Sequence, residues 1–184
     1  MKPKIRKIKK NLIGTKVPHR ASGRTGQFIE KVHAKVGMPV QPGKGPDYPK
    51  YDLEMKSKST ESTSAFSIGR MTKNDILNTD YKDSNIKDKM QHQYHVYHTD
   101  GIIVKQEVYD FTSEFIQEEI EAAYEASRKK LANGDTGWVY GSKFGHFEPS
   151  KDNPDSYQFR ITVGAMETLK NISNSTIDKF FKRK

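Results

Sequence analysis

Two carboxylates and a lysine fall within one span of ten residues: Asp47, Glu54 and Lys56. Carboxylates are hard oxygen ligands for Mg²⁺, which keeps several of its waters and bridges to phosphate oxygens. The ion lowers the pKa of a bound water and stabilises charge on a phosphate, and a neighbouring ammonium group can orient that water. Asp47 and Glu54 are therefore the expected ligands of Mg²⁺, with Mn²⁺ as a substitute, and Lys56 completes a site for phosphodiester hydrolysis.

A strand and a loop must position these side chains. Residues 50–58 alternate polar and apolar side chains, which predicts a half-buried strand that returns Lys56 to the face of Glu54. Asp52 falls on the same face, so it is a rival to Asp47 as a ligand. Residues 38–49 contain four prolines and predict the loop that carries Asp47. The apolar face of the predicted strand consists of Tyr51, Leu53 and Met55.

An amphipathic helix is predicted just before this loop. Ser22 or Thr25 can cap its start, and Gly37 can end it. The helix carries Glu30, which is expected to add a contact to the metal or to its water. Its apolar stripe consists of Phe28, Ile29, Val32 and Val36.

The remainder of the chain reads as strands interrupted by helices, which predicts an α/β or α+β fold with a mixed central sheet flanked by helices. A strand at 65–71 is expected to pair with the strand at 50–58. The other expected elements are a short helix at 82–90, a hairpin at 92–111 turned at Asp100 and Gly101, a long helix at 112–131, and a last strand at 157–163. The long helix has an apolar stripe formed by Phe115, Ile116, Ile120, Ala123, Tyr124, Ser127 and Leu131.

The positive charge is concentrated at the N-terminus. The net charge is +9, and residues 1–20 hold eight lysines and arginines without an acid. We interpret residues 1–20 as a basic, flexible arm that attracts a DNA backbone, followed by a single domain over 21–184. The alternative is a solvated end that only keeps the protein soluble. The arm residues expected to contact DNA are Lys4, Arg6, Lys7, Lys9 and Lys10.

Composition excludes several other classes of protein. The chain has no cysteine, so it can form neither disulfides nor thiolate metal sites. No run of about 18 apolar residues is present, so no membrane partner is expected, and the expected location is the cytoplasm. His92, His95 and His98 recur at intervals of three, but in a strand His95 faces away from the other two, so zinc is not expected.

Four aromatic residues near the C-terminal third are open to two interpretations. We expect them in the core. The alternative is that they stack on bases or wedge into a duplex. They are Trp138, Tyr140, Phe144 and Phe147.

The order of these motifs resembles the MutH-like branch of the PD-(D/E)XK nucleases. The similarity lies in Gly26 and Glu30 on the helix, then Asp47-Tyr48-Pro49, then Glu54 and Lys56 seven and nine residues after the aspartate. The chain departs from the family strand at Met55 and Ser57, where the family has Leu and Thr. The resemblance implies a restriction-endonuclease-like fold, and it extends over about Arg24 to Leu169.

Two further residues take expected roles from this resemblance alone. Lys89, in the segment SNIKDKM, is similar to a family lysine near the phosphate, which makes it a candidate catalytic residue beside Glu30. Arg160, in the segment 157–160, is similar to an arginine on the last family strand, and we expect it to contact DNA.

Three functions remain open on the sequence. The favoured one is a site-specific endonuclease of double-stranded DNA, of the type II restriction or phage type, which requires three carboxylates near one cleft. A homodimer would suit cutting of both strands. The second is a repair endonuclease that nicks one strand, and the third is a DNA-binding protein without catalysis.

Overall fold

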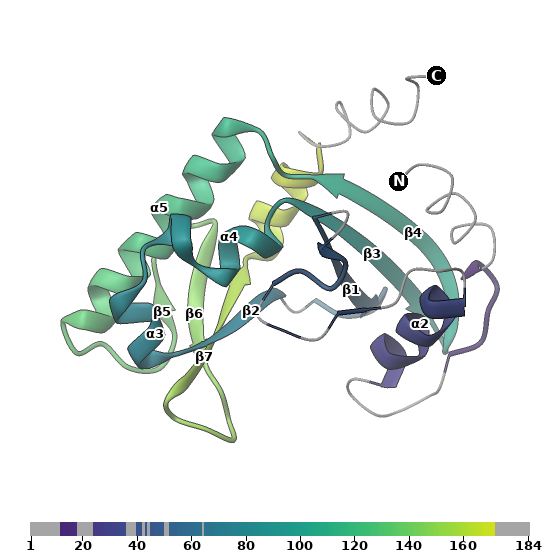
Figure 1. Ribbon diagram of the computed structural model, residues 1–184, viewed down its shortest axis with the longest axis horizontal. Coiled ribbons are helices and arrows are strands. Elements are labelled where there is room, and N and C mark those ends of the chain that lie inside the picture. The colour runs from purple at the N-terminus through teal and green to yellow at the C-terminus, as the bar shows by residue number, and fades with distance from the viewer. Residues whose placement is uncertain are drawn as a thin grey trace.

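The computed structural model describes residues 12–17, 24–35, 40, 41, 43, 45–49, 52–63 and 65–171. These residues form a mixed α+β structure with two sheets, which Figure 1 shows beside each other. The three-stranded sheet has the order β1(Leu53–Ser59), β3(His92–Thr99), β4(Ile102–Asp110). The four-stranded sheet has the order β2(Phe66–Thr72), β7(Ser156–Ile161), β6(Gly145–Pro149), β5(Val139–Tyr140). The predicted class is confirmed, with its strands divided between two sheets.

The partner of β1 is not the strand that follows it. β1 runs parallel to β3, with Glu54 opposite Gln93, and β2 pairs antiparallel with β7 instead. The prediction that 65–71 pairs with 50–58 is therefore wrong. A parallel pair needs a long crossover, and the chain between β1 and β3 provides one. That crossover contains β2, α3(Lys73–Asn78), the 3-10 turn η2(Tyr81–Asp83) and α4(Asn85–Lys89).

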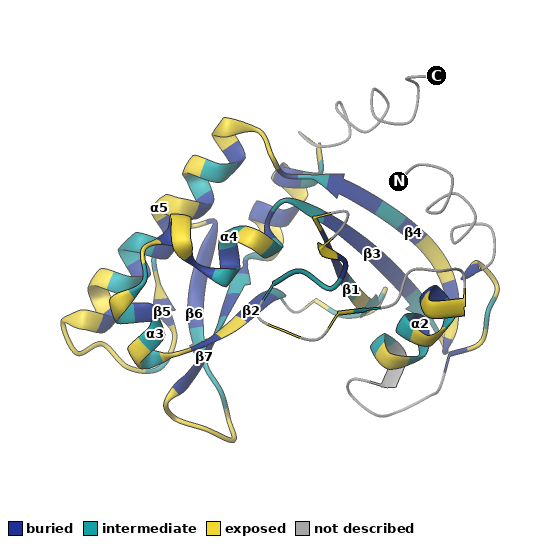
Figure 2. Ribbon diagram, in the orientation of Figure 1, coloured by how far each residue is buried: buried dark blue, intermediate teal, exposed yellow. Residues whose placement is uncertain are grey.

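The three-stranded sheet is built on the predicted hairpin. Asp100 and Gly101 have φ of 48° and 75°, the left-handed conformation that a tight hairpin turn requires. Figure 2 shows β3 buried along most of its length. The predicted helix is present as α2(Arg24–Lys35), and its Ile29 is buried in this core, whereas Val36 lies outside the described residues.

Part of the predicted arm belongs to this core. Leu12 and Val17 are buried, and the Gly14 N–H donates a 2.8 Å hydrogen bond to the Ile103 carbonyl on β4. Residues 12–17 are therefore packed rather than part of a flexible arm, because their apolar side chains cover the sheet. The five arm residues expected to bind DNA lie outside the described residues, so that prediction stays open.

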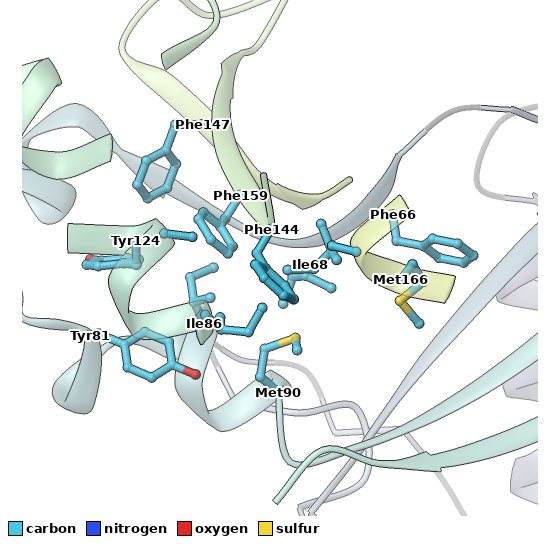
Figure 3. Close-up of a cluster of buried hydrophobic side chains, with 14 of the residues drawn as sticks. Phe66, Ile68, Tyr81, Ile86, Met90, Tyr124, Phe144, Phe147, Phe159 and Met166 are labelled. Atoms are coloured by element: carbon cyan, nitrogen blue, oxygen red, sulfur yellow. The ribbon is translucent and has the colours of Figure 1, made fainter. Parts of the chain in front are cut away.

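The four-stranded sheet packs one face against α5(Glu114–Ala132) and α4. Figure 3 shows Tyr124 of α5 among Phe147, Phe159 and Ile86 in this core. The predicted stripe of α5 is buried except at Phe115, which is 50% exposed. Phe115 sits about 100° around the helix from Ile116 and so falls off the stripe.

The last described segment packs against both sheets. Helical residues 163–171 follow β7, and Ala165, Met166 and Leu169 are buried in the core. Lys170 Nζ donates a 2.7 Å hydrogen bond to the Tyr97 hydroxyl on β3. Among the helices of the described residues, none is both long enough and apolar enough to cross a membrane.

Candidate active site

Glu54 lies at the junction of the two sheets with two lysines on one of its oxygens. Lys56 Nζ is 2.6 Å and Lys89 Nζ is 3.1 Å from Glu54 Oε1. Lys56 Nζ also donates to the Ile68 carbonyl of β2 at 3.1 Å, which links the edge strands of the two sheets. Glu54 is 2% exposed, whereas Lys56 and Lys89 are 21% and 15% exposed. The structure thus brings together three predicted catalytic residues, one of which is 35 positions away in the chain.

Lys89 reaches Glu54 because α4 approaches β2 closely. At Gly69 of β2, an added Cβ would stand 2.8 Å from Ile86 Cδ1 and 3.3 Å from Lys89 Cδ. Ser84 caps α4 by accepting a hydrogen bond from the Lys87 N–H. A larger residue at position 69 would displace the ends of the Ile86 and Lys89 side chains. The sequence analysis missed the role of Gly69.

Asp47 stands beside Glu54 through two backbone contacts. The Asp47 N–H donates to Glu54 Oε2 at 3.2 Å, and Asp47 Oδ2 accepts from the Met55 N–H at 2.9 Å. Burial and then the charge of Glu54 raise the pKa of Asp47 above its usual value. Two carboxylates held this close favour binding of a cation, which would relieve their mutual repulsion.

Asp52 does not share the face of Glu54. The strand begins at Leu53, and Asp52 precedes it in a turn with φ of 48°, where its side chain is exposed. The alternation that made Asp52 a rival ligand fails because the turn interrupts the extended backbone. Asp47 is the aspartate that the fold places beside Glu54.

Glu30 acts on this site at longer range. Its pKa is raised by burial and then by the charge of Asp47, so the two carboxylates interact electrostatically. However, no three acidic or histidine side chains within the described residues gather closely enough to hold a metal ion together. His92, His95 and His98 likewise form no such group, in line with their position on a strand.

A buried histidine and tyrosine support the Asp47 loop, and the sequence analysis assigned neither. Tyr48 follows Asp47, and its hydroxyl is hydrogen-bonded to His33 Nδ1 of α2. Both side chains are buried, and the His33 ring also packs on Tyr94 at 5.4 Å between centroids. The Tyr48 N–H bonds to the Leu53 carbonyl at 2.9 Å, which closes the loop onto β1. In the sequence, the position of His33 near the apolar stripe of the predicted helix indicates only that its side chain packs in the core.

His33 makes the fold sensitive to acid. Burial lowers its pKa from 6.5 to about 4, so the unfolded chain takes up a proton below pH 6.5 that the folded chain takes up only near pH 4. Stability should therefore fall as the pH drops from 6.5 to 4, by about 2 kcal/mol at pH 5 relative to neutral pH. Urea denaturation of the wild type and of His33→Phe at pH 7 and pH 5 measures this. A variant that loses as much stability as the wild type between these pH values would contradict the assignment.

Arg160 lies on β7 of the four-stranded sheet, opposite Ser67 of β2. Its Nε is paired with Glu148, and its other nitrogens donate to the Ala65 carbonyl at 3.2 Å and to Gln158 at 3.0 Å. The expected DNA contact of Arg160 stays a prediction. Of the four aromatic residues expected in the core, Phe144 and Phe147 are buried, but Trp138 and Tyr140 are 56% and 48% exposed. The core expectation is wrong for these two because Tyr140 lies on the face of the sheet opposite to that of the buried Val139, and Trp138 contacts His146 on that same outer face.

Comparison with known proteins adds no relative. No protein-family model matches the chain, and no curated protein is similar to it in sequence.

Proposed function

We propose that this protein is a metal-dependent endonuclease that hydrolyses phosphodiester bonds of DNA at Asp47, Glu54, Lys56 and Lys89. The observation that carries the proposal is the contact of two lysine Nζ atoms with Glu54 Oε1, beside a second carboxylate whose pKa is raised. A carboxylate pair with cations next to it has the composition needed to bind a divalent ion and a phosphate together. The similarity of the motifs to MutH-like nucleases supports the same chemistry.

The two carboxylates Asp47 and Glu54 suit Mg²⁺ better than an ion that takes all of its ligands from the protein. Mg²⁺ commonly takes one or two carboxylates, retains waters and binds substrate phosphate. The three carboxylates that the sequence analysis required do not gather into one metal-binding group within the described residues. Asp47 and Glu54 still supply two hard oxygen ligands, which is the number that Mg²⁺ commonly takes from a protein. Mn²⁺ accepts the same ligands. When bound, the ion supplies an acidified water and stabilises charge on the phosphate.

The chain's own residues have separable tasks in this proposal. Asp47 and Glu54 hold the cation, and the Met55 N–H fixes the orientation of the Asp47 carboxylate. Lys56 lies next to Glu54 and orients the water whose oxygen forms the new bond to phosphorus and whose proton passes to solvent. Lys89 brings positive charge to the phosphate as the bond to the leaving oxygen breaks. The leaving oxygen then takes a proton from water.

Digestion of supercoiled plasmid tests the proposal. The full chain with Mg²⁺ or Mn²⁺ should convert plasmid to open-circular or linear DNA, and EDTA should abolish the conversion. Linear product with a single set of sequenced ends indicates a site-specific double-strand cutter, and open circles alone indicate a nicking enzyme. Methylated and unmethylated plasmid are compared, so that protection by methylation is not mistaken for inactivity. DNA binding without cleavage of either plasmid would overturn the proposal in favour of a DNA-binding protein.

A further inference from the structure

One face of the four-stranded sheet presents aromatic and basic side chains. Tyr140 on β5 lies opposite His146 on β6, and His146 lies opposite Arg160 on β7. Side chains alternate between the faces of a strand, so these three share one face. Trp138, two residues before Tyr140, joins them by its contact with His146. We call Trp138, Tyr140 and His146 the aromatic row. The opposite face holds the buried residues Val139, Phe147 and Phe159.

The rings of the aromatic row are stacked, and two of them are open to solvent. Trp138 lies on His146 with centroids 5.3 Å apart and planes 12° apart. Tyr140 lies 4.7 Å from the same imidazole. His146 is 2% exposed, whereas the exposed fractions of Trp138 and Tyr140 are near one half. The indole therefore covers the imidazole with one face and keeps other surface available to a flat ligand.

His146 lacks hydrogen-bond partners in this position. Both of its ring nitrogens are buried, and neither has a partner among the residues that the structure describes. Burial lowers the pKa of His146, which favours the neutral ring. Both nitrogens are covered by Trp138 and Tyr140, so a ligand on the exposed surface does not reach them. The imidazole therefore supports the Trp138 indole from below, and the exposed part of the indole is the surface that a flat ligand can contact.

The charges on this face favour nucleic acid. Arg70 on β2 lies opposite Gln158, which lies opposite Glu148 on β6, so two arginines and one glutamate share the face with the aromatic row. Arg70 is exposed. Glu148 pairs with Arg160, so the exposed Arg70 supplies the net positive charge of this face, which complements a phosphate backbone next to the aromatic row.

We propose that the aromatic row binds an unstacked nucleobase of DNA, with the base lying on the exposed surface of Trp138. The inference rests on the proposed function in taking DNA as the substrate. Every base has a flat π-face, so aromatic platforms bind bases with little regard to sequence. A base inside a duplex is covered by its neighbours, whereas a base in a single strand or an opened duplex can reach the indole.

Intrinsic fluorescence reports on this site directly, because Trp138 is the single tryptophan of the chain. The full chain is titrated in EDTA, which prevents cleavage, with a 15-nucleotide single strand and with the paired duplex of the same sequence. The strand is the same in both titrations, unpaired in one and paired in the other. Comparison of the two therefore distinguishes binding of a base that is already unpaired from binding that requires the duplex to open. The single strand should quench the emission at lower concentration.

Variants separate stacking from mere proximity. Trp138→Ala should weaken binding of a labelled single strand by between about 5-fold and about 100-fold, and Trp138→Phe should retain most of the affinity. Phe115→Ala removes an aromatic ring of similar exposure from α5 and should leave the affinity unchanged. His146→Phe preserves an aromatic ring beneath Trp138, and it should retain most of the affinity. Thermal denaturation checks the fold of each variant.

Two results would overturn the inference. One is an emission that neither DNA quenches, and the other is a Trp138→Ala affinity equal to that of Phe115→Ala. A different outcome would assign the aromatic row to contact between copies of the chain. In that outcome the emission changes with protein concentration in the absence of DNA, and DNA affinity does not depend on Trp138. Plasmid cleavage without quenching rejects this inference alone. Quenching without cleavage rejects the nuclease and leaves base stacking in place.

Discussion

Replacement of Glu54 by Gln is expected to lower DNA cleavage by at least about a thousand-fold. The amide keeps the shape of the side chain but loses the charge that binds Mg²⁺ and pairs with Lys56 and Lys89. Initial rates of plasmid cleavage at saturating Mg²⁺ measure the loss. Lys56→Ala should lower the rate of DNA cleavage to a similar extent, because it removes the ammonium group that orients the water.

A matched acid controls for this change. Glu61 is exposed in the turn just after β1, and Glu61→Gln alters the same chemical group outside the candidate site. Glu61→Gln should cleave as the wild type does. Both variants should bind DNA in EDTA and show cooperative unfolding. Normal cleavage by Glu54→Gln would contradict the proposed active site.

Asp47→Asn should also abolish cleavage, whereas Asp52→Asn should have little effect. Asp47 is the carboxylate beside Glu54, and Asp52 is exposed in the turn before the strand. The two variants make the same chemical change five positions apart in the sequence. Plasmid cleavage over a range of Mg²⁺ concentrations compares them. Loss of activity only in Asp52→Asn would show that the ligands are assigned wrongly.

Stability provides a second measurement on the same pair. The raised pKa of Asp47 means that its ionised form is less favourable in the folded chain than in the unfolded one. This destabilisation appears as the pH rises from the usual aspartate pKa through the raised value, so it is present at neutral pH. The amide introduced by Asp47→Asn cannot ionise, and its carbonyl oxygen can still accept the Met55 N–H. Without metal at pH 7, Asp47→Asn should therefore melt no lower than the wild type, which separates inactivity from unfolding.

Local sequence patterns were sufficient for the elements that carry their own signal. The hairpin at Asp100 and Gly101 follows from residue types that tolerate positive φ, and α5 follows from apolar residues repeating at helical spacing. Glu54 and Lys56 could be placed on one strand face because side chains alternate along a strand. Each of these inferences depends on residues close together in the chain, so no knowledge of the fold was needed.

Turns and the two faces of a sheet limited how far such patterns could be extended. Asp52 fits the alternation of the strand, but a turn with positive φ removes it from the strand. Trp138 and Tyr140 are residue types common in cores, yet Tyr140 lies on the face of the sheet opposite to that of the buried Val139, and Trp138 lies beside it. A residue type states a preference for burial, and the face of the sheet that packs against helices decides whether burial occurs.

The sequence by itself determined the acid and lysine spacing of the site, the class of the fold and the concentration of positive charge near the N-terminus. The tertiary structure decided that β1 pairs with β3, that Lys89 of α4 reaches Glu54, and that His33 supports the loop of Asp47. These contacts join residues that are 15 or more positions apart in the chain. Their formation depends on how whole strands and helices pack, and no local pattern of residue types contains that information.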